Sequence, residues 1–401
     1  MSVHPTVVSL FAGLGGLDLG FELAGFRVVW ANEISENAAL SYATNFGRQP
    51  HCSDIVAVAN DQIPDADVIV GGPPCQSFSL VGQRRPDDER GRLVFRFRDI
   101  VLAKRPQAFV MENVPGMAAS RIEGKRLPDV LADEFRDAGY YVTVAKLNAT
   151  DFLVPQRRAR IFILGAKRGE VELPDPDTFA EECYGIARAG FELSAEAAIG
   201  DLGDPVGRGE RARYRYPPRS GIAKLLRSGN SDTVSLHEFP RMSDRDTQFV
   251  KHIPPGGNYM DIPDEISTDR IMKFKVSGGR TTTYGRLHPS RPAYTINTYF
   301  RRPNVGCHFH YSEPRLITPR EAMRFQCFPD CFRVIFGAQD ERNMYIGNAV
   351  PSLLAQAVAW SIRNCLEGRR ISVMPTQKNL SFADRDNEVR HDVRSRTSAT
   401  P

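Results

Sequence analysis

Cysteine is scarce in this sequence, and its distribution has no pattern. Seven cysteines in 401 residues form an odd-numbered set without regular spacing, which argues against the disulfide framework of small secreted proteins. The one close pair, in CFPDC, has no second pair near it, so we expect no zinc or other metal site. The thiols are taken to be reduced, and they are Cys52, Cys75, Cys183, Cys307, Cys327, Cys331 and Cys365.

Long apolar runs and internal repeats are lacking as well, and we expect no secretory leader. No apolar stretch is long enough to span a bilayer, and the N-terminal MSVHPTVVSLFAG lacks the basic start of a secretory signal. We therefore expect a cytoplasmic protein without membrane contact. Hydrophobic residues make up 41% of the chain and charged residues 25%, as in ordinary globular proteins. At 401 residues, we expect one large domain with insertions or two domains that share a cleft.

The net charge is also small, at +4, and by itself it does not require a polyanionic partner. The arginines, however, gather in QRRPDDERGRLVFRFR and again in GRGERARYRYPPRSGIAKLLR, where Tyr214 and Tyr216 lie among them. Basic stretches with interleaved aromatic residues suit phosphate contacts and base stacking. A solvated, salt-bridged surface explains either stretch equally well.

Short β-rich runs alternate with amphipathic stretches from Thr6 to about residue 166, which is typical of βα units on a mostly parallel, doubly wound sheet. Strands are expected at 7–10, 27–31, 67–70, 108–111, 141–147 and 160–164, and helices at 17–24, 35–45, 93–104 and 127–138. Residues 169–285 are rich in Gly, Pro, Arg and Ser, and predict a loop-rich domain whose strands cannot be placed. TPREAMRF predicts a Thr-capped helix, and a strongly apolar helix is expected from about Pro351.

The glycine-rich stretch FAGLGGLDLGFELAGF follows the first strand and opens a helix, so its backbone can cradle a ligand. It does not fit the dinucleotide fingerprint, whose third glycine would fall at Asp18, and tight helix packing is an equally good reason for the glycines. Glu33, at the end of the second strand, can accept from both ribose hydroxyls, and Asp54 can hold an adenine amino group. Together they indicate an adenosyl cofactor without phosphates, namely S-adenosylmethionine.

In GGPPCQSFSL, two prolines fix two φ angles directly after a strand and hold Cys75 in a set direction. A lone cysteine is more often a small buried hydrophobe, but this rigid setting favours a nucleophile, whose reactive form is the thiolate. Glu112 and Asn113 end another apolar strand in FVMENVPGM, at the same sheet edge, although a helix-capping role is an alternative. In VPQRRARIFILG, Arg158 and Arg160 lie on one side of a strand start, where they can hold an anion or a carbonyl oxygen and lower the pKa of a neighbouring thiol.

Six motifs occur in one order: FAGLGG, GPPCQSFS, ENV, QRRAR, GRLHPSRPAYTINT and GNAVP. This set resembles the DNA (cytosine-5) methyltransferases of bacterial restriction-modification type. The resemblance implies an α/β, Rossmann-like fold that depends on S-adenosylmethionine. It divides the chain into a catalytic domain at 1–180, a target-recognition domain at 181–334, a return to the catalytic domain at 335–372, and a tail at 373–401 that we expect to be disordered.

The resemblance also implies roles for residues. Cys75 would attack carbon 6 of a cytosine flipped out of the duplex, Glu112 would hydrogen-bond N3 and the exocyclic amine, Arg160 would contact O2, and Arg158 would help to position them. Loop 79–92 would close over the base. DNA contacts are expected from Ser79, Gln83, Arg84, Arg85, Arg213, Arg215 and Arg280. Cofactor contacts are expected from Phe11, Gly13, Leu14, Gly15, Glu33, Asp54, Ile55, Pro73, Asn348 and Val350.

One departure from the family pattern is Arg96, where an acidic residue is common, and we expect altered loop or backbone contacts there. Two other functions stay open: an RNA (tRNA) cytosine-5 methyltransferase, and an inactive DNA-binding regulator on the same fold. The large variable middle favours DNA, and the intact Cys75, Glu112 and Arg160 argue against an inactive protein. The expected partner is double-stranded DNA at the bacterial nucleoid, bound by a monomer, with a separate cognate restriction endonuclease left open. The target sequence cannot be read from the chain.

Overall fold

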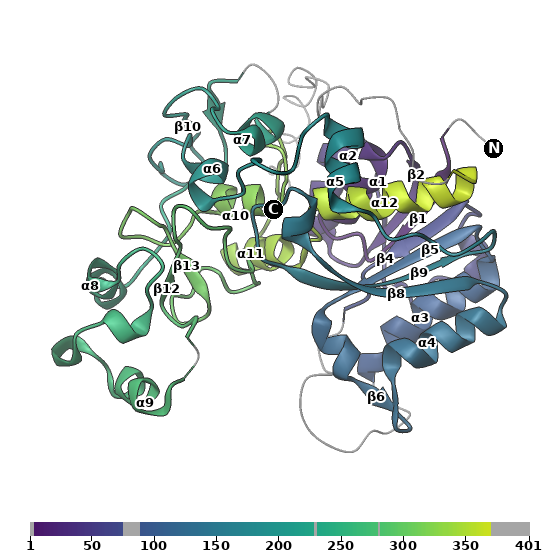
Figure 1. Ribbon diagram of the computed structural model, residues 1–401, viewed down its shortest axis with the longest axis horizontal. Coiled ribbons are helices and arrows are strands. Elements are labelled where there is room, and N and C mark those ends of the chain that lie inside the picture. Colours follow the sequence, from purple (N-terminus) through teal and green to yellow (C-terminus); the bar gives the residue numbers. More distant parts are fainter. Residues whose placement is uncertain (1–3, 75–88, 228–230, 280, 370–401) are drawn as a thin grey trace, which may run out of the picture.

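The computed structural model describes residues 4–74, 89–227, 231–279 and 281–369. Within these ranges, seven strands form one sheet in the order β3-β2-β1-β4-β5-β9-β8 (Figure 1). Their bounds are β1 Thr6–Leu10, β2 Arg27–Glu33, β3 His51–Cys52, β4 Val68–Gly71, β5 Ala108–Asn113, β8 Tyr141–Asn148 and β9 Ala159–Ala166. Six of the seven strands run in one direction, while β9 runs antiparallel to both of its neighbours. The predicted mostly parallel, doubly wound sheet is confirmed.

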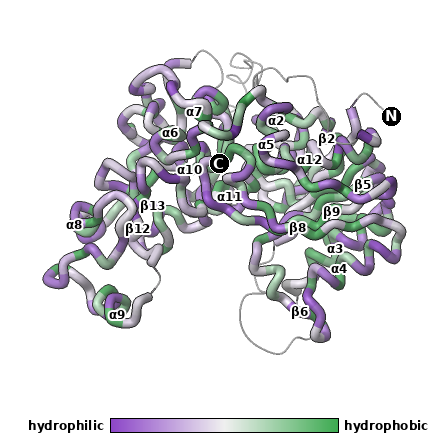
Figure 2. Tube along the Cα trace, viewed as in Figure 1, coloured by the Kyte–Doolittle hydropathy of each residue, from purple (hydrophilic) through white to green (hydrophobic). Residues whose placement is uncertain are grey.

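Helices cover both faces of this sheet because its central strands are hydrophobic on both sides. Successive residues of a strand point to opposite faces, and one set packs toward α1 (Gly16–Leu23) and α12 (Ser352–Glu367), the other toward α3 (Glu89–Lys104) and α4 (Leu127–Asp137). The first set includes Val7, Val68, Val70 and Val110, and the second includes Val8, Ile69, Phe109 and Met111. Figure 2 shows the hydrophobic residues running through these strands.

The helix ends follow the residues that the sequence supplies. Helix α2 (Glu36–Phe46) is capped by Ser35, whose Oγ accepts from the Ala38 amide over 3.5 Å. Helix α10 (Pro319–Phe325) starts with a capping box, in which the Thr318 hydroxyl and the Glu321 carboxylate each accept from the other residue's amide. The helices expected from the sequence are all present, and α3 begins four residues earlier than expected.

Helix α12 returns from the end of the described chain and packs mainly on α1, with a smaller contact to β9 (Figure 1). Two glycines of the glycine-rich stretch make this possible. A Cβ on Gly20 would lie 2.4 Å from the Ala355 Cβ, and a Cβ on Gly16 would lie 2.3 Å from the Val350 carbonyl oxygen. Close helix packing therefore explains these two glycines, while Gly13 and Gly15 serve the loop described below.

The remaining elements are short. A two-stranded hairpin, β6 (Arg121–Ile122) and β7 (Lys125–Arg126), precedes α4. Helix α5 (Pro176–Tyr184) lies with the sheet half, near α2 and α12 (Figure 1). The smaller half of the molecule, at the left of Figure 1, contains α6 (Ala195–Ile199), β10 (Ala212–Arg213), α7 (Gly221–Leu226), β11 (Thr233–Val234), α8 (Asp244–His252), α9 (Asp269–Ser277), β12 (Gly285–Arg286), β13 (Cys307–Phe309) and α10, on which α11 (Gln339–Asn348) packs. Its loop-rich character agrees with the sequence. None of the helices that the structure describes combines the length and apolar character that a membrane span needs.

Candidate active site and cofactor cavity

A cavity of about 390 Å³ opens at the carboxyl ends of β1, β2, β4 and β5. This edge is where open α/β sheets bind their ligands. Arg160 joins the lining because β9 starts beside the end of β5, with Asn113 paired to Ile161. The lining residues come from segments far apart in the chain: 9–14, 16–17, 33–35, 72–74, 112–114, 160, 344–345 and 348–350.

The glycine-rich loop forms one wall of this cavity. Gly13 has φ +56°, and a Cβ built on it would meet nothing within 4 Å, so its Cα faces open space. Gly15, at the N-cap of α1, has φ +82°, and a Cβ there would lie 2.4 Å from the Phe46 ring. Phe11 is also left-handed, with φ 57° although it has a side chain, and such backbone strain is typical of functional sites. Gly15 is thus needed for backbone conformation and packing, and it does not line the cavity.

Glu33 lies at the end of β2 with its carboxylate held by two backbone amides. The Gly13 amide donates to Oε2 over 2.8 Å, and the Ser35 amide donates to Oε1 over 2.9 Å. Each carboxylate oxygen has a further lone pair. The geometry leaves one acceptor site on each oxygen for a vicinal pair of hydroxyls.

The Pro73–Pro74 turn is anchored from the neighbouring strand. Asn113 donates from Nδ2 to the Pro73 carbonyl over 3.0 Å, and its side chain is buried. Asn113 therefore supports the backbone directly before Cys75 instead of capping a helix. Cys75 itself lies outside the described residues, as do Ser79, Gln83, Arg84, Arg85 and Arg280, most of loop 79–92 and the predicted tail at 373–401.

Glu112 and Arg160 form a buried ion pair in the cavity wall. Arg160 Nε lies 2.8 Å from Glu112 Oε1, and both residues are 7% exposed. The N–H does not point along this contact, so Oε1 makes no regular hydrogen bond. Burial raises the pKa of Glu112 above its ordinary value, against the opposing effects of Arg160 and Arg158. The raised pKa means that the protonated form of Glu112 is favoured more here than in water.

Arg158 is buried behind the cavity and does not line it. Its guanidinium donates to the carbonyls of Ile296 (2.8 Å), Gly347 (2.8 Å) and Ala349 (3.0 Å). Gly347 is packed so closely that a Cβ would lie 2.5 Å from the backbone of Asn297. Arg158 therefore joins three distant chain segments, and its part in the site is to hold Asn348 and Val350 in the cavity wall.

Most of the predicted cofactor residues converge here. Phe11, Gly13, Leu14, Glu33, Pro73, Asn348 and Val350 all line the cavity. Asp54 and Ile55 do not: the Asp54 side chain is exposed, and Ile55 is buried in the core on the α3 side.

Arg96 holds the loop at residues 54–60. Its guanidinium donates to the Ile55 carbonyl (3.1 Å), the Val58 carbonyl (2.5 Å) and Asn60 Oδ1 (2.8 Å). The expectation of backbone contacts from Arg96 agrees with this arrangement.

Most basic residues of the run in the smaller half are exposed, but one of its arginines and one of its tyrosines are used within the protein. Arg227 lies over the Tyr214 ring, 3.6 Å from its centroid, and the Tyr214 hydroxyl donates to Asp330 over 2.8 Å. Tyr214 is therefore not presented for base stacking, which corrects that interpretation. Arg213 and Arg215 are exposed, although Arg215 forms an ion pair with Asp204 at 3.0 Å. Their DNA contacts stay predictions.

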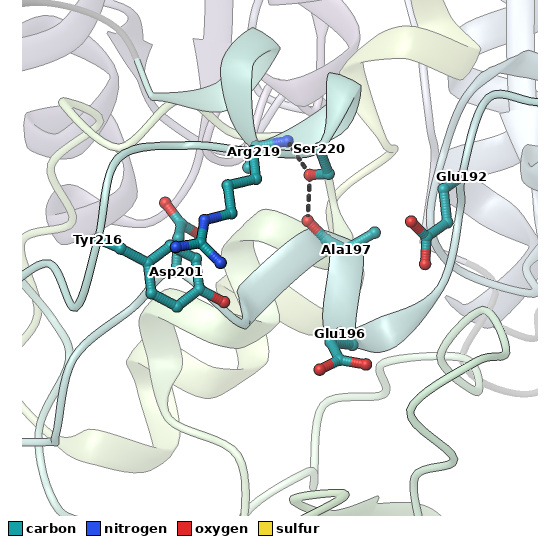
Figure 3. A pocket seen from close by; sticks show the side chains of 8 residues that line it. Glu192, Glu196, Ala197, Asp201, Tyr216, Arg219 and Ser220 are labelled. Carbon is teal, nitrogen blue, oxygen red and sulfur yellow. Dashed lines mark hydrogen bonds between the residues drawn. The ribbon is translucent and has the colours of Figure 1, made fainter.

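A second cavity, of about 270 Å³, lies between α6 and α7 (Figure 3). Arg219 lies over the Tyr216 ring, 4.4 Å from its centroid, and the Ser220 hydroxyl donates to the Ala197 carbonyl over 2.5 Å. The cavity is lined by Glu192, Glu196, Ala197, Asp201, Tyr216, Arg219, Ser220 and Ala223. Its lining carries three carboxylates and one guanidinium, which does not favour a phosphate inside this cavity, and the predicted DNA contacts of this run stay predictions.

Sequence reasoning missed a buried polar cluster beneath the glycine-rich loop. Asp18, in the first turn of α1, accepts from the Ser9 hydroxyl over 2.5 Å and from the Tyr42 hydroxyl over 2.6 Å. Burial raises the pKa of Asp18. A carboxylate within the apolar stretch GLDLGF was the available signal, because a buried charge needs partners. The cluster ties β1, α1 and α2 together below the cavity.

The chain was compared with known proteins. The family model for C-5 cytosine-specific DNA methylase matches residues 5–364. The type II methyltransferase M.NgoFVII of Neisseria gonorrhoeae is 32% identical over 402 aligned residues, covering 97% of this chain and 96% of that relative. The type II methyltransferase M.XorII of Xanthomonas oryzae pv. oryzae is 33% identical, covering 90% and 85%.

Solved structures support the same fold. A putative DNA modification methyltransferase encoded within an Escherichia coli prophage matches with a TM-score of 0.66 at 24% identity, covering 90% of this chain and 99% of that one. The Dnmt2 methyltransferase of S. pombe matches with a TM-score of 0.56 at 16% identity, covering 91% and 99%. The chain belongs to the C-5 cytosine-specific DNA methylase family, and its activity is the transfer of a methyl group from S-adenosylmethionine to carbon 5 of cytosine in DNA.

Proposed function

We propose that the cavity at the β1–β5 edge is the catalytic site of this reaction, and that Cys75 is its nucleophile. The observation that carries the proposal is the convergence of Glu112, Arg160 and Glu33 on one cavity, beside the turn that leads into Cys75. The Cys75 thiolate adds to carbon 6 of a flipped cytosine, which makes carbon 5 nucleophilic toward the methyl group. Loss of the carbon 5 proton to a base then breaks the Cys75–carbon 6 bond and frees the methylated cytosine.

Glu112 is proposed to hold the cytosine through N3 and the exocyclic amine. Addition at carbon 6 pushes electrons into the ring, and a proton shared with N3 stabilises them. Burial favours a protonated Glu112, as its raised pKa indicates, so the carboxyl can supply that proton. Arg160 lies 2.8 Å from this carboxyl through Nε and donates from Nη1 to the Ala159 carbonyl, so Nη2 is proposed to contact O2 of the base.

The cofactor supplies an electrophilic methyl group. The fit of S-adenosylmethionine rests on the chain's own groups: Glu33 has two acceptor positions left for ribose hydroxyls, and the Cα of Gly13 faces open space where a ligand can approach. Phe11, Leu14, Pro73, Asn348 and Val350 complete the wall. Gly15, Asp54 and Ile55 do not line the cavity, so their predicted cofactor contacts are not part of this proposal.

Residues 181–334 are proposed to recognise the DNA target, with residues 1–180 and 335–372 as the catalytic domain. Exposed Arg213 and Arg215 lie in the first of these parts. The named relatives are type II methyltransferases, which supports a restriction-modification role with a separately acting endonuclease. We further propose that the protein acts as a monomer on duplex DNA in the bacterial cytoplasm.

A trapping experiment tests the nucleophile. Duplex DNA that contains 5-fluorocytosine should form a covalent complex with the protein and cofactor, because fluorine cannot leave as a proton does. Cys75→Ser should abolish the complex, and a retained adduct would show that another residue is the nucleophile. Labelled methyl groups that appeared in tRNA and not in duplex DNA would instead favour the RNA alternative.

A further inference from the structure

Tyr345 lines the cavity from α11, in the segment 335–372. Its hydroxyl makes two hydrogen bonds, one to α11 itself and one across the edge of the cavity to the start of α2. One partner is Ser35 Oγ, at the start of α2, and the other is the Glu341 carboxylate, one turn earlier in α11. Ser35 and Tyr345 are 310 positions apart in the chain. The contact therefore joins the loop that follows β2 to the helix that delivers Asn348 to the cavity.

The direction of these hydrogen bonds follows from the groups present. A carboxylate can only accept, so the single hydroxyl proton of Tyr345 is donated to Glu341, and Ser35 must then donate to the Tyr345 oxygen. Glu341 is fixed by further donors: Asn37 Nδ2 lies 3.0 Å from each carboxylate oxygen, and the Gly337 amide donates over 2.7 Å. The chain of donors runs from Ser35 through Tyr345 to an anchored carboxylate.

The three hydrogen-bonded side chains of Ser35, Tyr345 and Glu341 are called the relay below. The backbone of Ser35 connects this relay to Glu33. Its backbone amide donates to Glu33 Oε1 over 2.9 Å, while the other carboxylate oxygen accepts from Gly13. A shift of Ser35 would therefore rotate or release the Glu33 carboxylate. Charge-assisted hydrogen bonds such as the one to Glu341 are about twice as strong as neutral ones, so the relay ends on a firm anchor.

We infer that Tyr345 is a positioning residue for the cofactor's ribose, acting through Ser35 on the Glu33 carboxylate. The inference rests on the proposed placement of the cofactor in this cavity. It assigns to the Tyr345 hydroxyl an effect on cofactor affinity without direct contact between that hydroxyl and the transferred methyl group.

The attachment of the return segment to α2 does not depend on this hydroxyl. Asn45 Nδ2 donates to the Arg333 carbonyl over 2.7 Å and Asn45 Oδ1 accepts from the Arg333 amide over 2.9 Å. The Ile335 amide donates to Ser41 Oγ over 2.7 Å. Asn37, Ser41 and Asn45 are spaced by four residues, so they lie on one face of α2. Removal of one hydroxyl should thus leave the fold intact and expose its effect on binding.

The test compares binding of S-adenosylhomocysteine to full-length wild-type protein and Tyr345→Phe by titration calorimetry. Loss of one hydrogen bond to this relay should weaken binding about tenfold. The KM for S-adenosylmethionine should rise by a similar factor, with kcat at saturation nearly unchanged. Tyr140→Phe is the matched control: it removes a tyrosine hydroxyl that donates to the Pro106 carbonyl over 2.9 Å, away from the cavity, and should leave both constants unchanged.

Two further measurements distinguish an effect of Tyr345 on the position of the Glu33 carboxylate from a general loosening of the cavity. The effect of Tyr345→Phe should disappear for a 2′,3′-dideoxyribose analogue of S-adenosylhomocysteine, which offers Glu33 no hydroxyls. In a double-mutant cycle, Ser35→Ala should add little to Tyr345→Phe, because both break the same relay. Equal losses for both ligands, or full additivity, would overturn the inference. If Glu33→Ala weakens binding while Tyr345→Phe does not, the relay is wrong and the cofactor site stands; if Glu33→Ala also has no effect, the site itself is misplaced.

Discussion

The two halves of the molecule both bury arginine–carboxylate pairs, and they do so with opposite results. In the sheet half, Glu112 and Arg160 form a single close contact at a cavity, and burial raises the pKa of the carboxyl. In the smaller half, Arg324 donates to Asp330 through two nitrogens, over 2.9 and 2.6 Å, and also pairs with Asp201. There burial also opposes ionisation, but Arg324 and Arg320 outweigh it, and the pKa of Asp330 lies below its ordinary value.

The difference separates a reactive site from a structural one. A carboxylate such as that of Asp330, held by a bidentate guanidinium and a tyrosine hydroxyl, is fixed in its charged form, whereas one with a single close ion-pair contact can still gain a proton. Residue type and burial alone therefore do not identify catalysis. The substitutions below test this difference. A substitution at the Glu112 site should lower activity and leave stability nearly intact, and one at the Arg324 cluster should lower stability and leave cofactor binding intact.

The largest effect is expected from Glu112→Gln. The amide keeps the shape of the side chain but cannot supply a proton to N3, so kcat should fall roughly 10²- to 10⁴-fold. Stability at neutral pH should change little, because removing the Glu112 charge, which burial disfavours, offsets part of the cost of leaving Arg160 with a neutral partner. Methyl transfer to duplex DNA and urea denaturation measure the two properties. A stable variant with nearly full activity would refute the assignment of Glu112.

Arg324→Met should show the reverse pattern. Arg324 is 0% exposed, and its loss leaves the buried Asp201 and Asp330 without their cation. Breaking a buried pair in this way costs about 3–5 kcal/mol of unfolding free energy, which urea denaturation can measure. The exposed, non-bidentate pair of Arg215 with Asp204 provides the control, since Arg215→Met should cost less than about 1 kcal/mol. Cofactor binding by the folded fraction of Arg324→Met should be retained.

Gly72→Ala tests how closely the site is fitted. Gly72 precedes the Pro73–Pro74 turn, and a Cβ there would lie 2.9 Å from Glu112 Oε2. The methyl group should push the carboxyl from its position, and since misplacement by about 1 Å can cost 10²-fold, we expect kcat to fall about 10- to 100-fold. Gly116→Ala, where a Cβ would meet nothing within 4 Å, is the matched control in the loop after β5. Equal activities of the two variants would mean that Glu112 is not held as tightly as the structure indicates.

The same contrast explains what the sequence could and could not predict. Strands, helices and the cavity-lining loops of the sheet half follow local patterns: alternation, glycines, and motifs at strand ends. In TPREAMRF, by contrast, Arg320 and Arg324 resemble the polar face of a surface helix, yet both are buried. One partner of Arg324, Asp201, is 123 positions away in the chain, and the Ser35–Tyr345 contact spans 310. Such pairings have no local signature, and for the same reason Asp54 and Ile55 were expected in a wall that they do not line.

The smallest and most diagnostic effect is in the pH dependence of stability. Asp330 has a lowered pKa in the folded state, so its contribution is present above its unfolded pKa of about 4 and is lost as the pH falls through the folded value. Glu112 has a raised pKa, so its contribution is present at low pH and is lost as the pH rises through the folded value. In urea denaturation between pH 7 and pH 3, Asp330→Asn should therefore flatten the loss of stability toward acid, and Glu112→Gln should steepen it. A mutation's general cost shifts the whole curve, whereas a changed titration alters its slope. Changes in slope of the same sign for both variants, relative to wild type, would therefore contradict the division between a fixed and a titratable carboxyl.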